Sequence, residues 1–401
     1  MIDAARRPRM DPDRLRRARS YRKFSLALEL VAAAVGIGVM LGLYWAGTGV
    51  AVRDAFAHLL QGGARPCDLV SCPGGTPVRA GVTYLVIVVF TLIGSLVALP
   101  EAYLGWRRGR REGLVVQSWR GELADRAKAL VITAVLVDVP LTAWYLILVR
   151  PEWAAWTIVG SLVLSAAGTL AGPTLAGLFF RFEPLADAEV AQRVRAVAER
   201  AGVRVSGVYR WGMAAKTTAA NAAVLGVGPT KRIVLGDTLL ERFPMEEVES
   251  VVAHEVGHDV SGDPPRYVVA LGIAGAAALV VIRVALDRVI CGAAGCAAGA
   301  VGPVGGVADP ASYPLVAAAL ALLSFVGRPA LMAFTRWRES AADVFGARHT
   351  SPDSMGRALV RLADQNLSDP EPPRWEEIWF YSHPRIADRV RKLGLRWEDV
   401  G

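Results

Sequence analysis

The chain has 401 residues, of which 53% are hydrophobic and 20% are charged, and its formal net charge is +8. This composition is too apolar for an ordinary soluble protein and indicates several membrane spans. Positive charge also fits a nucleic-acid partner, but nine Lys or Arg residues precede residue 24 and seven more lie from Arg107 to Lys128, beside long apolar stretches. Membrane proteins fix their orientation in this way, so we expect a lipid bilayer as partner and no nucleic acid.

Six stretches of the chain are long and apolar enough to cross a hydrocarbon core of roughly 30 Å. They are Ser25–Trp45, Val82–Leu99, Leu130–Val149, Trp153–Phe180, Tyr267–Leu286 and Leu315–Phe334. Because basic segments face the cytoplasm, both termini and the segments after the second and fourth spans are expected there. Nearly all basic residues are Arg, as in GC-rich bacterial genomes, so we predict a multi-pass protein of the bacterial plasma membrane.

The spans divide the chain into five predicted parts. They are a basic cytoplasmic N-terminus (1–24), four spans (25–180) with an outer loop 47–80 and a basic inner loop 105–128, a cytoplasmic segment (181–266), two spans (267–334) with an outer loop 287–312, and a cytoplasmic C-terminal segment (335–401).

The four cysteines form two pairs of equal spacing, Cys67 with Cys72 and Cys291 with Cys296. Both pairs fall in loops predicted to lie outside, where disulfides persist. Each pair can close on itself or bridge the two loops, and the sequence does not decide between them. A zinc site built from all four is less favoured, because both loops are rich in Gly and Pro.

Two charged residues lie inside predicted spans, Asp138 near Pro140 and Arg328 before Pro329. Charged groups at such depth normally face the interior of a helix bundle or water. The two residues are therefore expected to pair, to line a hydrated chamber, or to make polar packing contacts. Glu29 lies close enough to the membrane surface for its carboxylate to reach water.

The segment 181–266 has the pattern of a small α+β unit. Helical periodicity predicts helices over Asp187–Ala201 and from Phe243 to about Ser261, where Gly and Pro follow. Alternation of apolar and polar residues predicts three strands. They are Val203–Tyr209, Ala222–Val227 and Arg232–Leu235.

The second of these helices carries the run His254-Glu255-Val256-Gly257-His258. Residues four apart share a helical face, so the two imidazoles can bind one zinc ion while Glu255 takes a proton from the metal-bound water. A chance match in a helix is the alternative. The chain has only five histidines, and two of them stand at the required spacing, which favours a metalloprotease.

A catalytic zinc usually has three protein ligands and one open position. Asp263 is near in sequence, although its position past the helix end is more typical of a loop carboxylate. Glu339, with Asp343 four residues later, lies after the sixth span in the same predicted compartment. One carboxylate would bind zinc and the other would accept the free N–H of a ligand histidine. A solvated acidic pair beside Arg336 and Arg338 remains an equal alternative on the residues alone.

At these residues the sequence resembles the type I CAAX prenyl proteases and, more distantly, the bacterial stress-induced membrane protease. That family pairs a His-Glu-x-x-His helix with a downstream Glu-x-x-Ala-Asp, which Glu339 to Asp343 matches. The resemblance implies that Glu339 is the third ligand and that Asp343 supports a ligand histidine. It extends over roughly residues 95 to 391 and is weak in the first two spans.

Two further motifs carry the resemblance. Asn221-Ala222 is similar to the start of the family's edge strand, which binds the substrate backbone. His383-Pro384, followed by Arg389, is similar to a C-terminal motif whose His and Arg face the cleavage site. The eukaryotic members have seven spans where we count six, and paired cysteines in outer loops are not part of the family pattern.

The fold implied is a mainly α, multi-span transmembrane helical bundle with a zincin-like α+β metalloprotease domain built from cytoplasmic segments. One zinc ion would lower the pKa of its bound water to about 7. Glu255 would take the proton and pass it to the leaving amine, while His383 or Arg389 stabilises the oxyanion. The substrate would lie extended along the strand that begins at Asn221.

The chain is thus predicted to be a gluzincin-type zinc metalloendopeptidase with its site towards the cytoplasm. Bacteria generally do not prenylate proteins, so we expect its substrates to be membrane-associated proteins or peptides. One alternative is a quality-control protease of broad specificity. A non-catalytic membrane scaffold or receptor with a structural zinc is a further alternative, and Glu255 argues against it because a structural site needs no general base.

Overall fold

The computed structural model describes residues 11–60, 75–292 and 304–396. Cys67, Cys72 and Cys296 lie outside the described residues. Cys291 is disulfide-bonded, and its partner also lies outside them, so the connectivity stays open.

Six long helical segments are apolar enough to cross a membrane and confirm the six predicted spans. The first is α1 (Pro12–Trp45), and the second joins α3 (Gly75–Val97) to α4 (Leu99–Glu112). The third joins α5 (Trp119–Thr133) to α6 (Val139–Ile147) through a π-helical turn, Ala134–Asp138, and the others are α7 (Trp153–Ala176), α11 (Asp263–Cys291) and α12 (Tyr313–His349). A shorter helix, α2 (Thr48–Leu60), follows α1.

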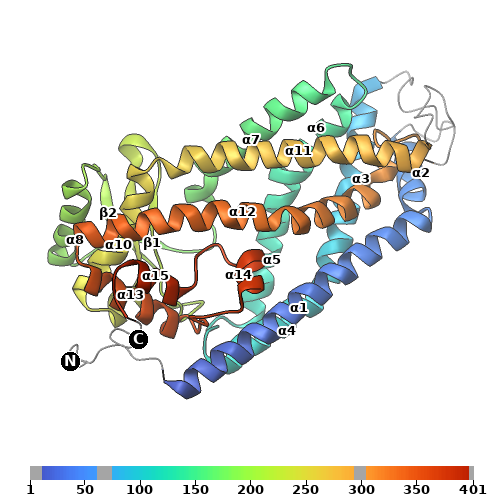
Figure 1. The fold of residues 1–401 in the computed structure, drawn as a ribbon. Coiled ribbons are helices and arrows are strands. Elements are labelled where there is room, and N and C mark those ends of the chain that lie inside the picture. The colour runs from blue at the N-terminus through green and yellow to red at the C-terminus, as the bar shows by residue number, and fades with distance from the viewer. Residues whose placement is uncertain (1–10, 61–74, 293–303, 397–401) are drawn as a thin grey trace.

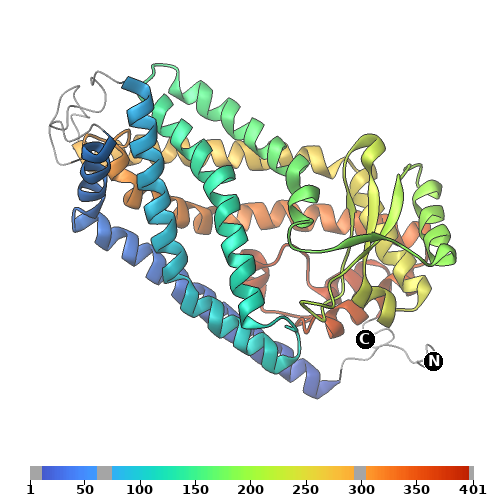
Figure 2. The same ribbon diagram turned by 180° about the vertical axis from the view of Figure 1, so that it is seen from behind.

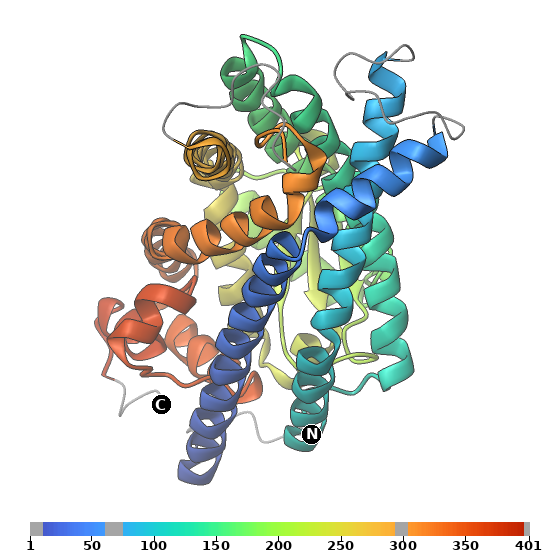
Figure 3. The same ribbon diagram turned by 90° about the vertical axis from the view of Figure 1, so that its right-hand side faces the viewer.

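A small sheet and several short helices lie at one end of the long helices (Figures 1 and 2). Seen along the long helices from the other end, the strands lie behind and between them (Figure 3). The strands are β1 (Phe182–Pro184), β2 (Gly207–Trp211), β3 (Ala222–Leu225) and β4 (Arg232–Gly236), in the order β1-β2-β4-β3. Only the β2–β4 pair is parallel, and β3 is an edge strand.

Helices α8 (Ala188–Arg200) and α10 (Met245–Val260) pack their apolar faces against this sheet. The short helix α9 (Asp237–Arg242) follows β4 directly. The remaining helices, α13 (Pro352–Gln365), α14 (Arg374–Phe380) and α15 (Ile386–Lys392), come after α12. The predicted helices and strands of segment 181–266 are present, with the first strand shifted to 207–211. The three-residue β1 and six-residue α9 are too short for periodicity to reveal.

Helix α12 does not end at the predicted boundary of the sixth span near Thr335. It has 37 residues and is therefore about 55 Å long at 1.5 Å per residue, well beyond the roughly 30 Å of a hydrocarbon core. The helix is therefore longer than a span requires, and its last turns carry Glu339. The start of the C-terminal segment is thus a rigid continuation of a span.

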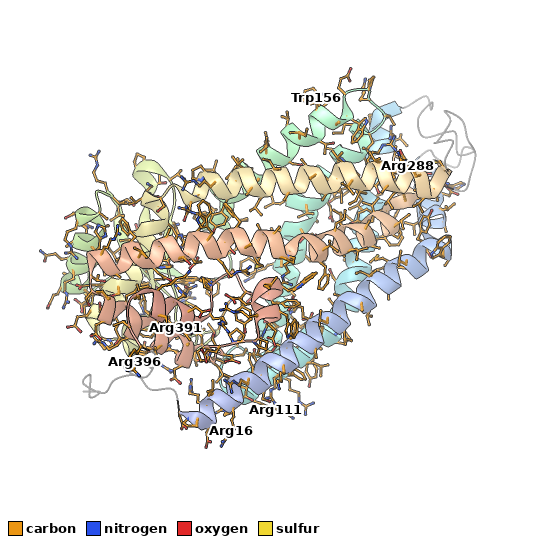
Figure 4. All side chains as sticks on the ribbon, viewed as in Figure 1. Arg16, Arg111, Trp156, Arg288, Arg391 and Arg396 are labelled. Atoms are coloured by element: carbon orange, nitrogen blue, oxygen red, sulfur yellow. The ribbon has the colours of Figure 1, made fainter. Side chains whose placement is uncertain are left out.

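Labelled side chains mark the two ends of the molecule in Figure 4. Arg16 and Arg111 lie at the end where Arg391 also lies, whereas Trp156 and Arg288 lie near the opposite end. The basic start of α1, the basic end of α4 and the C-terminal helix α15 therefore share one side.

The two charged residues inside spans do not pair with each other. Asp138 is 1% exposed and accepts a hydrogen bond of 3.2 Å from Thr91 Oγ1. Arg328 pairs instead with Glu29 of α1, and its guanidinium lies 4.9 Å from the centre of the Phe380 ring. Of the three alternatives that the sequence left open, the Asp138–Arg328 pair is excluded, and the contacts with Thr91 of α3 and Glu29 of α1 fit polar packing between helices.

One buried ion pair in the part of the molecule around the sheet can be tested by a simple experiment. Glu247 of α10 is 1% exposed and accepts hydrogen bonds from Arg361 of α13 at 2.6 and 3.2 Å. We predict that Arg361→Ala lowers the free energy of unfolding by about 2–3 kcal/mol, because it leaves a buried charge without its main partner. The measurement is the melting temperature of the purified protein in detergent.

The matched control is Arg193→Ala. Arg193 pairs with Glu249 of the same helix at 2.8 Å, but its side chain is 41% exposed. Exposed pairs contribute less than about 1 kcal/mol, so the control should shift the melting temperature much less. Equal shifts for both variants would contradict the assignment of Glu247 as a buried ion-pair partner.

Candidate metal centre and active site

The centre of the site is the contact between α10 and α12. Helix α10 begins after Pro244 with two glutamates in its first turn, which suits the helix dipole. Its buried face carries His254 and packs on α12 where both helices have a glycine. A Cβ at Gly346 would lie 3.2 Å from the backbone N of His254, and one at Gly257 would lie 3.0 Å from the Phe345 ring. The two glycines let the helices approach closely.

This packing brings three ligand atoms together. The Nε2 atoms of His254 and His258 are 3.2 Å apart. Glu339 of α12 places Oε2 3.3 Å from His254 Nε2 and Oε1 3.3 Å from His258 Nε2. These three residues form the only group of three or more His, Cys, Asp or Glu ligands found among the described residues.

The triangle fits a tetrahedral metal ion. Donors at roughly 2.0–2.1 Å from a zinc ion are separated by about 3.3 Å in a tetrahedron, which matches the three observed separations. Glu339 Oε2 is also buried without a hydrogen-bond partner among the described residues, as expected of an atom that awaits a cation. Burial lowers the pKa of His254, but Asp343 and Glu339 raise it more, to about 10, so the surroundings favour positive charge.

Each of the two histidines has a carboxylate behind its other ring nitrogen. His254 Nδ1 lies 3.0 Å from Asp343 Oδ1. His258 Nδ1 lies 2.7 Å from Oδ2 of Asp263, the first residue of α11. Such carboxylates fix the tautomer and the orientation of a ligand imidazole.

Each carboxylate is in turn held by an arginine. Arg389 of α15 donates two hydrogen bonds, of 2.6 and 2.7 Å, to Asp343. Arg338 of α12 pairs with Asp263, and both side chains are buried. These arginines balance the charge of carboxylates that would otherwise be buried unpaired.

Glu255 lines the same cavity as His254. Burial raises the pKa of its carboxyl, while the neighbouring imidazoles of His254 and His258 lower it, and the net direction is upward. A carboxyl with a raised pKa beside such a pocket is suited to accept and then return a proton.

His383 reaches the site from the loop between α14 and α15. Its Nε2 lies 3.2 Å from Glu339 Oε2, and its Nδ1 lies 2.8 Å from Ser382 Oγ. Its side chain is half exposed. Arg389 is placed differently: its guanidinium binds Asp343 and lies 3.8 Å from Glu339 Oε2. It lines the cavity and also supports His254 through Asp343.

The edge strand β3 forms one wall of a cavity of about 370 Å³. Asn221 and Ala222, at its start, line this cavity together with His254 and Glu255. The backbone O of Asn221 accepts from Gly236 N of β4, and its side chain accepts from Ala222 N. The opposite wall is largely apolar and comes mainly from α13.

The structure therefore brings all the predicted site residues to one cavity or to its immediate surroundings. What sequence reasoning missed is the contact of Asp263 with His258, and with it Arg338. The sequence shows only that Gly262 precedes Asp263; in the structure Gly262 has a φ of +65° and Asp263 is the first residue of α11. Only the turn angle decides that this carboxylate points back to His258.

Comparisons with known proteins found relatives of this chain. The model of peptidase family M48 matches residues 184–396. The uncharacterized metalloprotease YhfN of Bacillus subtilis (strain 168) is 28% identical over 314 residues, which cover 76% of this chain and 71% of that protein. The CAAX prenyl protease 1 homolog of Mus musculus is 24% identical over 354 residues, with the same shares, and protease HtpX of Acinetobacter baumannii (strain AYE) is 27% identical over 228 residues, with 52% and 71% covered.

A solved structure shares the fold. The crystal structure of S. mikatae Ste24p has a TM-score of 0.79 to this chain at 19% sequence identity, covering 96% of this chain and 89% of that one. The fold is thus shared, and the M48 family model together with the CAAX prenyl protease relatives confirms the resemblance that the motifs indicated. Since the family model matches more than half of the 401 residues and six helices can cross a membrane, the chain belongs to peptidase family M48 and is an integral-membrane metalloprotease.

Proposed function

We propose that the protein is a gluzincin-type zinc metalloendopeptidase that cleaves membrane-associated proteins or peptides. The observation that carries this proposal is the triangle of His254, His258 and Glu339, whose ligand atoms are 3.2–3.3 Å apart. A general base, Glu255, lines the adjoining cavity. A structural metal site would need neither this base nor an open cavity.

The bound zinc would polarise the scissile carbonyl and lower the pKa of a bound water. Glu255 takes the proton of the attacking water and later gives it to the leaving amine. His383 donates a hydrogen bond to the oxyanion, and Arg389 holds Asp343 and so the orientation of His254. The substrate backbone adds to the free edge of β3 beginning at Asn221.

The substrate class rests on the setting of the site. Helix α12 carries Glu339 directly beyond a span, so a peptide bond near the membrane surface can reach the cavity. The relatives named CAAX prenyl protease 1 homolog support a processing role, and broad-specificity quality control is the alternative. The basic segments at the same end support a location in the bacterial plasma membrane with the site towards the cytoplasm.

We predict that Glu255→Gln keeps zinc but lowers peptide cleavage by at least about 10²-fold, because the amide cannot take the water's proton. Zinc content is measured by metal analysis, and cleavage is measured with a quenched fluorescent peptide chosen for turnover by the wild type. If purified Glu255→Gln still cut this peptide at the wild-type rate, the mechanism would be wrong.

The ligand set makes a separate prediction. Glu339→Ala should strongly reduce zinc bound per chain, whereas Asp263→Asn should retain the stoichiometry and weaken affinity about 10–100-fold, since Asp263 acts through His258. Competition with a zinc chelator measures both values. Asp353→Ala, which removes an exposed carboxylate of α13, is the control. Full zinc content in Glu339→Ala with loss in Asp263→Asn would make Asp263 the third ligand.

The inactive Glu255→Gln variant also distinguishes a processing enzyme from a quality-control protease. Expressed in bacterial membranes, it should retain uncut substrates, which mass spectrometry identifies. A processing enzyme should retain a few proteins that the wild type cuts at one shared motif. Many unrelated proteins with scattered cleavage sites would instead establish quality control.

A further inference from the structure

We infer that Arg336 is a positioning residue that holds the His383 loop against the helix that carries Glu339. The inference rests on the proposed function, because it concerns the geometry of His383 at that site. Arg336 binds neither the metal nor the substrate in this proposal; it acts through His383.

The contacts of Arg336 are all to backbone at the end of α14. Its Nη1 donates to the carbonyl oxygens of Glu377 at 2.7 Å and of Tyr381 at 2.9 Å, with Ile378 O further away at 3.4 Å. Tyr381 follows the last residue of α14, and its N–H already donates to Glu377 O at 3.3 Å, so Arg336 adds a second donor to that carbonyl. A cation at this end also suits the helix dipole. Arg336 of α12 thus caps the C-terminal end of α14. Its partner Tyr381 lies two residues before His383.

Arg336 stands on one face of α12 with two site residues. Arg336, Glu339 and Asp343 have the spacing i, i+3 and i+7, so they line one stripe of the helix. Each contacts a successive part of the same C-terminal segment. Arg336 holds the end of α14, Glu339 meets His383 at 3.2 Å, and Asp343 binds Arg389 of α15. The loop that carries His383 is therefore held at both ends: Arg336 binds the end of α14 before it, and Arg389 of α15 follows it.

The anchor is needed because α14 is short. It has seven residues, and isolated helices of this length are unstable in water. Arg22 of α1 and Arg328 of α12 also contact this region, but they lie over the rings of Tyr381 and Phe380 at 4.9 Å. These two arginines contact side chains, whereas Arg336 binds the backbone that leads to His383.

The test is a double-mutant cycle of Arg336→Ala with His383→Ala on the full-length protein in detergent, assayed with the quenched fluorescent peptide. We expect Arg336→Ala to lower kcat about 10–100-fold, because small displacements of a catalytic group have effects of this size. KM and zinc content should change less than about threefold. In the His383→Ala background, the same change should have almost no further effect, because its target is gone.

Two further variants keep the test decisive. Arg336→Lys retains a charge and can reach one carbonyl, so its kcat should lie between those of Arg336→Ala and the wild type. In the His383→Ala background, Arg336→Lys should cause no further decrease in kcat. Arg374→Ala removes an exposed arginine from the start of α14, where it pairs with Glu377 and Asp388, and should leave kcat within about twofold of wild type.

The outcomes separate the inference from the proposed function. If His383→Ala cleaves as the wild type does, the role proposed for His383 is wrong, and the inference fails with it. If His383→Ala is impaired but Arg336→Ala is fully active, only the inference is overturned. Additive losses in the double variant, or loss of zinc in Arg336→Ala, would assign Arg336 a general structural role and also overturn it.

Discussion

The close packing of α10 against α12 is the contact on which the site depends. Neither helix alone provides a metal site: α10 has two imidazoles, and α12 has one carboxylate. The glycines at 257 and 346 remove the side chains that would hold the helices apart. The three ligand atoms consequently lie at tetrahedral separations without any loop having to adjust. A site set by two long helices is more rigid than one carried on loops.

The same packing buries charge, and the charge is balanced in two parallel sets of contacts. Asp343 lies between His254 and Arg389, and Asp263 lies between His258 and Arg338. A buried carboxylate without a partner would cost several kcal/mol. Each arginine removes that cost and leaves the carboxylate free to orient its histidine. The arginines therefore explain why so many charged groups are stable in a poorly hydrated contact.

Much of this arrangement could be predicted from the sequence, and the limits have physical reasons. The six spans follow from length and apolarity, and the imidazole pair follows from helical spacing, because both are local properties. Glu339 needed a family resemblance, since 80 residues separate it from His258. The contact of Asp263 with His258 depends on the turn at Gly262, which spacing does not encode. The partners of Asp138 and Arg328, which the sequence left open, show the same limit, because pairing between spans depends on how helices pack.

Arg336 illustrates what only the tertiary structure can reveal. In the sequence it is one of several arginines near Glu339, and its spacing of three residues from that ligand is as consistent with a solvated surface as with a function. Its partners are backbone carbonyls, and no pattern of side chains in the sequence predicts such a contact. Because α12 runs unbroken from the membrane to Asp343, a displacement of the span would move Arg336, Glu339 and Asp343 together. Glu339 and the two side chains on α12 that hold the segment around His383 would then keep their relative geometry.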